Sequence, residues 1–393
     1  MINIIDKQTC CGCSACASIC PKQCIRLQDD NEGFFYPKVE VRNCINCGLC
    51  DKVCNMLNPY EKREPLKVFA SINKNDEIRL NSSSGGIFYN LASQTIQNGG
   101  VVFGARFDKT WQVVIDYAED MKGVVDFMGS KYVQSRIEDS YKNAKKFLQQ
   151  GRQVLFSGTP CQIAGLHKYL RVPYDNLISV DFICHGTPSP KVWGYYLRHI
   201  VDDLNQISMI SFRNKLYGWK NFSFVLKYSD GEKKLSFLLP HKKDLYMKAF
   251  LQDIILRPSC YACKSKDCSS QSDITIADFW GVHKLFPGMD DDKGTGLVLL
   301  NTDKGVKVYK SGQFLDKETT YENVKSLNPA SIHSAKLHPK RDVFFSRLDQ
   351  DDLLSLIEDC TKLTFKQRLY DCVDKWMSLL YCELKKFSRA WKQ

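Results

Sequence analysis

The chain has 393 residues, of which 44% are hydrophobic and 25% charged, a composition ordinary for a soluble globular protein of about two domains. It has no run of eighteen apolar residues and no basic start followed by a long apolar core, so we expect neither a membrane span nor a secretory signal, and a cytoplasmic protein. The formal charge is +11, but no nucleic-acid motif accompanies it, so we expect no nucleic-acid partner.

Cysteine is the unusual component: there are eighteen, ten of them before residue 55. A secreted disulfide scaffold is usually short and matures in an oxidising compartment, and neither condition fits this chain. In a reducing compartment, dense Cys-x-x-Cys spacing indicates metal or cluster ligation. Three thiolate-bound 4Fe-4S clusters of about −2 each would lower the net charge to roughly +5.

Residues 1–60 contain two copies of the spacing C-x2-C-x2-C-x3-C. Two-residue gaps place three sulfurs around one iron–sulfur cube, and the fourth cysteine serves the other cube. The predicted ligands are Cys10, Cys13, Cys16 and Cys54 for one 4Fe-4S cluster, and Cys44, Cys47, Cys50 and Cys20 for the second. Zinc, the alternative, favours two separated Cys-x-x-Cys pairs. Cys11 and Cys24 fall outside the pattern and are expected to be packing residues.

After a charged linker at 61–65, apolar strand-like runs alternate with helix-like segments. We expect strands at 101–103, 154–156, 178–183 and 274–277, and helices at 87–97, at 137–149, from 161 onward and at 190–203. This alternation is typical of an α/β domain with parallel strand pairing. Alternating apolar residues on either side of Asp230-Gly231 predict a β-hairpin over 222–239.

Two cysteines follow predicted strands directly. Thr159 can cap a helix in which Pro160 takes the first position and Gln162 completes a capping box. Cys161 then lies in the first helical turn, where free amides and the helix dipole favour a thiolate. Cys184 likewise comes directly after a predicted strand. Both would lie at the carboxyl edge of a parallel sheet, where such folds bind ligands.

Further sulfur ligands come from the spacing Cys260-x2-Cys263-x4-Cys268. These three could complete a cluster with Cys161 or Cys184. Alternatively, the set is Cys161, Cys184, Cys260 and Cys263, which leaves Cys268 free. Tetrahedral zinc would suit any of these sets.

A polar turn, Asn-Ser-Ser-Ser-Gly-Gly at 81–86, precedes the helix predicted at 87–97. Hydroxyls and free amides at a helix start form an anion site, so the turn is a candidate phosphate or flavin cradle, with a simple N-cap as the alternative. The sequence has no G-x-G-x-x-G and no P-loop fingerprint. The last thirty residues have helical spacing and a basic polar face; we expect them to pack on their own domain, with docking on a partner or a membrane surface as the alternative.

Together these segments resemble the beta subunits of coenzyme F-420 hydrogenases and dehydrogenases, in their ferredoxin-fused bacterial branch. The match runs from the first cysteine motif to about residue 305. It is carried by residues 82–86, 129–135, 156–166, 182–188, 257–263 and 272–281.

The resemblance implies FAD in the α/β domain beside an inner 4Fe-4S cluster, and electron transfer between a hydride-type substrate and single-electron clusters. It favours Cys161, Cys184, Cys260 and Cys263 as the inner-cluster ligands. The flavin contacts that it implies are Ser83, Ser84, Gly85, Gly86, Lys131, Gln134, Ser135, Thr159 and Asp278. For Asp278, a structural cap is the alternative.

We therefore predict an α+β two-cluster ferredoxin-like domain at 1–60, an α/β flavin- and cluster-binding domain at 66–335 and a helical C-terminal extension at 340–393. The predicted function is a flavin-dependent iron–sulfur oxidoreductase acting between ferredoxin, or another redox protein, and a small molecule. That molecule is coenzyme F-420 or another compound, with a sugar intermediate of polysaccharide biosynthesis as one candidate. The alternative is a non-catalytic electron-transfer subunit of a larger complex. No catalytic residue is assigned; His185 is a proton donor to substrate or a structural residue.

Overall fold

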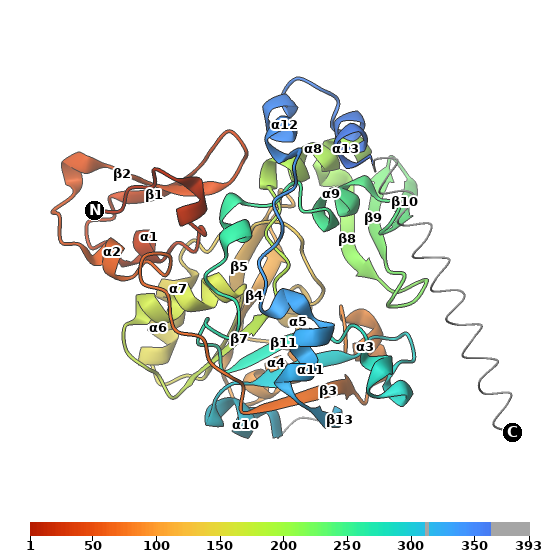
Figure 1. Ribbon diagram of the computed structural model, residues 1–393, viewed down its shortest axis with the longest axis horizontal. Coiled ribbons are helices and arrows are strands. Elements are labelled where there is room, and N and C mark those ends of the chain that lie inside the picture. Colours follow the sequence, from red (N-terminus) through yellow and green to blue (C-terminus); the bar gives the residue numbers. More distant parts are fainter. Residues whose placement is uncertain (311–313, 363–393) are drawn as a thin grey trace, which may run out of the picture.

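The computed structural model describes residues 1–310 and 314–362, so most of the predicted C-terminal helix lies outside the described residues. Figure 1 shows the N-terminal segment as a separate lobe against one side of a larger body built on a wide sheet. None of the helices in the described ranges combines the length and the hydrophobicity needed to cross a bilayer.

The N-terminal lobe is built from short elements because each cysteine triad forms a tight turn. The third cysteine of each triad lies in a short helix, Cys16 in α1 (Ala15–Ile19) and Cys50 in α2 (Leu49–Lys52). Between them lie the antiparallel strands β1 (Ile25–Asp29) and β2 (Phe35–Val39), flanked by the 3-10 helices η1 (Lys7–Thr9) and η2 (Val41–Asn43). Each α-helix starts after a residue in the left-handed region, Ser14 or Gly48, which lets the chain turn sharply out of the ligand loop.

The main body contains an eight-stranded mixed sheet in the order β13-β3-β12-β11-β7-β6-β4-β5. Its strands are β3 (Lys67–Asn73), β4 (Val101–Phe107), β5 (Val113–Ala118), β6 (Val154–Ser157), β7 (Leu177–Phe182), β11 (Ile274–Asp278), β12 (Gly296–Leu300) and β13 (Phe314–Thr319). Parallel pairing was predicted and is confirmed for β4, β6, β7 and β11. The remaining pairs are antiparallel.

Helices cover both faces of this sheet, which explains the continuous apolar runs of its central strands. Helices α4 (Ile87–Gln97), α5 (Met121–Val125) and α10 (Asp303–Lys310) pack on one face. Helices α6 (Ser140–Gln149) and α7 (Pro160–Leu170) pack on the other, and there they also contact the N-terminal lobe through Cys13 and Val53. Helix α6 starts three residues later than predicted because Glu138 has a positive φ of 47°, which no right-handed helix accommodates.

A second, three-stranded antiparallel sheet has the order β10-β9-β8, with β8 (Ile207–Asn214), β9 (Ser223–Asp230) and β10 (Lys233–Pro240). The hairpin predicted over 222–239 is confirmed as β9–β10. This sheet shares a core centred on Trp193 with α8 (Pro190–Ile200), α9 (Leu245–Leu251), α12 (Arg341–Arg347) and α13 (Leu353–Thr361). The described part of the predicted C-terminal extension is therefore integrated into this core.

The shorter elements complete the chain. They are α3 (Asp76–Asn81), α11 (Tyr321–Leu327) and the 3-10 helices η3 (Leu204–Gln206), η4 (Pro258–Ala262), η5 (Val282–Lys284), η6 (Pro287–Met289) and η7 (Pro329–Ser331). The predicted linker at 61–65 runs along the main body. There the Arg63 guanidinium donates to the carbonyl of Ser272, and the Leu66 amide donates to that of Leu300 (2.7 Å).

Candidate redox site

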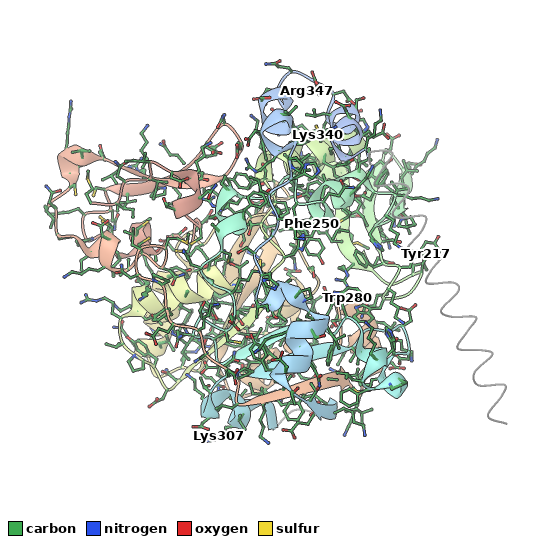
Figure 2. The ribbon with its side chains drawn as sticks, in the orientation of Figure 1. Tyr217, Phe250, Trp280, Lys307, Lys340 and Arg347 are labelled. Carbon is green, nitrogen blue, oxygen red and sulfur yellow. The ribbon has the colours of Figure 1, made fainter. Side chains whose placement is uncertain are left out.

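A cavity of about 670 Å³ opens at the carboxyl ends of the parallel strands. Ser157, Phe182 and Asp278, the last residues of β6, β7 and β11, all line it. The three-stranded sheet and its loops form the opposite wall. Figure 2 labels Phe250 of α9 and Trp280 of the loop after β11; both lie near the middle of the view, and both line this cavity. The sheet edge predicted from the strand-end cysteines is therefore the location of a large cavity.

The structure brings all nine predicted flavin contacts to the wall of this one cavity. They are Ser83, Ser84, Gly85, Gly86, Lys131, Gln134, Ser135, Thr159 and Asp278. They come from four separate loops of the main body, so their common location is a property of the fold.

The Ser-Gly-Gly turn is held in place by close packing. The Ser83 hydroxyl lies 2.9 Å from that of Ser130, and the Ser84 hydroxyl donates to the Thr295 carbonyl (2.8 Å). A Cβ at Gly85 would lie 2.5 Å from the Gly296 nitrogen, so only glycine permits this approach of the turn to β12. Helix α4 starts after Gly86 without a side-chain cap, which leaves its first amides available to an anionic ligand.

Lys131 is a half-buried lysine in the same wall. Its Nζ donates to the carbonyls of Asp126 (2.7 Å), Met128 (2.9 Å) and Gly129 (3.3 Å). Burial lowers the pKa of the Lys131 ammonium to about 7. An anionic group bound in the cavity would favour its charged form, so this wall suits a phosphate or another anion.

The turn into α7 has the predicted capping geometry. The Thr159 amide donates to the Gln162 side-chain carbonyl (3.0 Å), and Pro160 takes the first helical position. The Gln162 amide group donates to the Ser135 hydroxyl (2.8 Å), which joins two predicted flavin loops. Gln162 itself was predicted only as a capping residue, and its second role follows from the tertiary contact.

Asp278 lines the cavity, but its carboxylate is already occupied. Arg213 donates to both oxygens (2.7 and 3.2 Å), and the Trp219 indole donates to Oδ1 (2.8 Å). This geometry supports the structural alternative for Asp278. Arg213, Phe222, His241 and Trp280 also line the cavity and were not predicted as site residues. Phe222 belongs to the predicted hairpin, whose alternation says which residues share a face but not what that face meets. Arg213 and Trp280 lie outside that hairpin, in β8 and in the loop after β11.

The four cysteines favoured for the inner cluster converge beside this cavity. Cys161 and Cys184 line it, while Cys260 lies in η4 and Cys263 ends that helix. Burial, together with the thiols of Cys260, Cys161 and Cys263, raises the pKa of Cys184. Backbone amides point at two of the sulfurs: that of Thr187 at Cys260 (3.3 Å) and that of Ser265 at Cys263 (3.4 Å). Sulfurs that accept amide hydrogen bonds suit thiolate ligation of a cluster.

Cys268 lies elsewhere. Its thiol is 3.8 Å from the Tyr321 hydroxyl, in a core cluster that contains Phe279 and Val282. Of the alternatives that the spacing left open, the geometry therefore favours the set without Cys268.

The expectation that the start of α7 favours a Cys161 thiolate is wrong for the protein chain alone. The neighbouring Cys11 thiol, and then burial, raise the pKa of Cys161 well above its usual value. The helix dipole is too weak to offset these effects, so a thiolate here needs a cation such as cluster iron. Cys11, predicted to be a packing residue, lines the cavity next to Cys161.

In the N-terminal lobe, Cys20, Cys44, Cys47 and Cys50 surround a small pocket of their own, as the spacing predicts for one ligand set. The Ile2 amide donates to the Cys50 sulfur (3.3 Å). Cys24 also lines this pocket, with its sulfur 3.4 Å from that of Cys20, although sequence reasoning placed it outside the pattern.

The other set is Cys10, Cys13, Cys16 and Cys54, of which Cys10 and Cys13 contact the main body. Cys10 and Cys54 both act on the Cys16 thiol, whose pKa burial raises. Cys13 packs against α7, where a Cβ at Gly165 would lie 3.0 Å from the Cys13 sulfur. Within the part of the chain that the structure describes, no three His, Cys, Asp or Glu side chains surround a point where a metal ion could bind. In a 4Fe-4S cluster each cysteine sulfur binds a different iron, so the four sulfurs lie farther apart than the ligands of a single metal ion.

His185 follows Cys184 directly and lines the cavity. Its Nε2 lies 2.6 Å from Asp253 Oδ1, and its ring makes an edge contact with Phe250. The ring therefore lies close to a carboxylate, without a hydrogen bond between the two, and against an aromatic residue.

Comparison with known proteins divides the chain in the same way. Residues 9–56 match the 4Fe-4S dicluster domain, and residues 151–322 match the C terminus of the coenzyme F420 hydrogenase/dehydrogenase beta subunit. The coenzyme F420-dependent sulfite reductase of Methanocaldococcus jannaschii is 25% identical over 202 residues, which cover 48% of this chain and 30% of the relative. An uncharacterized ferredoxin of that organism is 35% identical over 51 residues, which cover 13% of this chain and 65% of the relative.

The chain thus spans less than two thirds of the length of either curated relative. Among solved structures, a chain of the F420-reducing [NiFe] hydrogenase complex from Methanosarcina barkeri superimposes with a TM-score of 0.45 and 16% identity. That match covers 76% of this chain and 90% of the other.

Proposed function

Because the chain is a coenzyme F420 hydrogenase/dehydrogenase beta-subunit-like protein with a 4Fe-4S ferredoxin domain, we propose that it is a flavin-dependent oxidoreductase with three clusters. It would transfer electrons between a redox protein such as ferredoxin and a small molecule. Coenzyme F420 is the first candidate substrate, since one curated relative is an F420-dependent enzyme.

The observation that carries this proposal is the convergence on one cavity. Nine residues predicted as flavin contacts line it, and so do Cys161 and Cys184 of the predicted inner cluster. A flavin bound there would exchange two electrons as a hydride with a small molecule and single electrons with a cluster. FAD and an anionic substrate are both compatible with a wall that contains Lys131 and the uncapped start of α4.

The positions of the cysteine sets suggest an order for electron transfer. Cys47 is exposed, so the set around it is accessible to a redox partner. The Cys10 set faces the main body, and its Cys13 touches α7, whose first turn carries Cys161. The order would run from the outer set through the Cys10 set and the inner set to the cavity.

The first experiment is an anaerobic absorption spectrum with iron, zinc and flavin assays on one sample. Three clusters predict about twelve iron per chain, with one flavin. About eight iron without flavin would leave a two-cluster carrier and overturn the proposal. A colourless sample that contains zinc would do the same.

The second experiment tests the inner cluster by the variant Cys161→Ser. We expect it to keep the two N-terminal clusters and its flavin while reduced ferredoxin no longer reduces that flavin. Normal flavin reduction in this variant would contradict the assignment of Cys161.

A further inference from the structure

Arg257 is the residue on which the N-terminal lobe and the inner cysteines meet. It directly precedes η4, which carries Cys260, and its side chain is 1% exposed. Its Nε donates to the Cys10 carbonyl (2.8 Å), and its Nη2 donates to the Phe35 carbonyl (3.0 Å) and lies 3.6 Å from the Cys10 sulfur. The guanidinium therefore reaches across from the main body into the first cysteine loop.

Among the described residues, no carboxylate accepts a hydrogen bond from this buried charge. Its remaining partner is the Gln134 side-chain carbonyl (3.4 Å), and its plane lies 4.1 Å from the Tyr36 ring centre. A guanidinium buried in this way is costly unless negative charge lies close to it. The ionisable groups that act on it most are Cys10, Tyr36, Cys11 and Cys260.

The neighbouring loop is shaped around this side chain. Gly12, between two cysteines of the first triad, has a φ of +70°. A Cβ there would lie 2.5 Å from the Gln134 amide nitrogen and 3.1 Å from Arg257 Nη1. The backbone of the ligand loop thus approaches the guanidinium more closely than any side chain would permit.

We infer that Arg257 is a positioning residue shared by two clusters: the one ligated by Cys10 and the inner one ligated by Cys260. This inference rests on the proposed three-cluster function. A fixed positive charge in a buried site stabilises the reduced, more negative state of each neighbouring cluster, and so raises its reduction potential. Within the described residues, the hydrogen bonds of Arg257 reach no cysteine of the outer set around Cys47, and the Met1 ammonium near that set is already paired with Asp51 (2.7 Å). Arg257 would thereby draw an electron from the outer cluster toward the main body.

Arg341 is the matched control. It too is buried and joins the main body to the N-terminal lobe, with Nη2 donating to Glu32 (2.6 Å) and Nε to the Leu256 carbonyl (3.1 Å). Its contacts reach the β1–β2 turn and no cysteine. If Arg257 were only an anchor for the lobe, Arg257→Gln and Arg341→Gln would behave alike.

The test is an anaerobic redox titration of all clusters by electron paramagnetic resonance, with the iron content of each sample measured. In Arg257→Gln we expect two midpoint potentials to shift to more negative values and the third to stay in place. Arg257→Lys, which keeps the charge, should restore most of the shift, and Arg341→Gln should move none of the three. Unchanged potentials in an iron-replete Arg257→Gln protein would overturn the inference, and so would equal shifts in all three clusters.

If Arg257→Gln loses iron, the variant Gln134→Glu replaces it as the test. This variant places a carboxylate against the Arg257 guanidinium, so the positive charge is neutralised while the arginine side chain stays in place. The same two potentials should then fall, and their constancy would overturn the inference. If the wild type has three clusters but no charge variant shifts a potential, the role of Arg257 is refuted and the proposed three-cluster function still stands. About eight iron in the wild type would refute the inner cluster, and the shared role with it.

Discussion

Replacing Cys184 or Cys268 by alanine tests the central assignment of the site. The Cys184 thiol is half-buried beside the cavity, and the thiols that act on it are those of Cys260, Cys161 and Cys263. Removing one ligand of a four-cysteine cluster should cost that cluster its four irons, so iron should fall from about twelve to about eight per chain. Cys268 contacts Tyr321 in a separate core. Its loss should leave the iron unchanged and lower the free energy of unfolding by about 1 kcal/mol.

The assay is iron and acid-labile sulfide per chain after strictly anaerobic purification, with the thermal midpoint measured on the same samples. Each variant removes one sulfur atom, so each is the control for the other. If Cys268→Ala lost four irons while Cys184→Ala kept all twelve, the choice of ligands made from the geometry would be refuted.

Three further changes follow from the same structure. Gly85→Ala would bring a methyl group to 2.5 Å from backbone atoms of Gly296 and Ser71, and should lower the free energy of unfolding by about 1–3 kcal/mol, measured by thermal denaturation. Burial raises the pKa of Asp244 to about 6, so the native state binds more protons than the unfolded chain between about pH 4 and 6, and stability should fall by about 3 kcal/mol as pH rises through that window. Asp244→Asn should remove this dependence from thermal midpoints measured between pH 4 and 7. Lys131→Met should weaken flavin binding roughly tenfold, measured by flavin fluorescence after ultrafiltration.

Each of these changes has a control or a contrary result. A Cβ at Gly288 would meet no atom within 4 Å, so Gly288→Ala should leave the thermal midpoint in place. Parallel pH curves for wild type and Asp244→Asn would contradict the shifted carboxyl. The exposed Lys122 of α5 is the charge control for Lys131, and equal flavin loss in Lys122→Met and Lys131→Met would count against a specific contact.

Several features of this protein could be predicted from the sequence because they depend on residues close together in the chain. Tandem two-residue gaps specify cluster loops, and the Cys20, Cys44, Cys47 and Cys50 side chains do surround one pocket. The capping pattern of Thr159 and Gln162 predicted the first residue of α7, Pro160, correctly, because the hydrogen-bonding groups of a capping box lie within one helical turn.

Tertiary structure alone decided how distant segments meet. The position of β3 between β12 and β13 depends on pairing between residues more than 200 positions apart, which local periodicity does not encode. The spacing could not decide whether Cys184 or Cys268 is a ligand together with Cys260. The chain between Cys260 and either cysteine is long enough to bring the two sulfurs to one cluster. Arg257 carries no local signal for its contact with Cys10, which lies 247 residues away. Its role follows from burial and from the charges that the fold places around it.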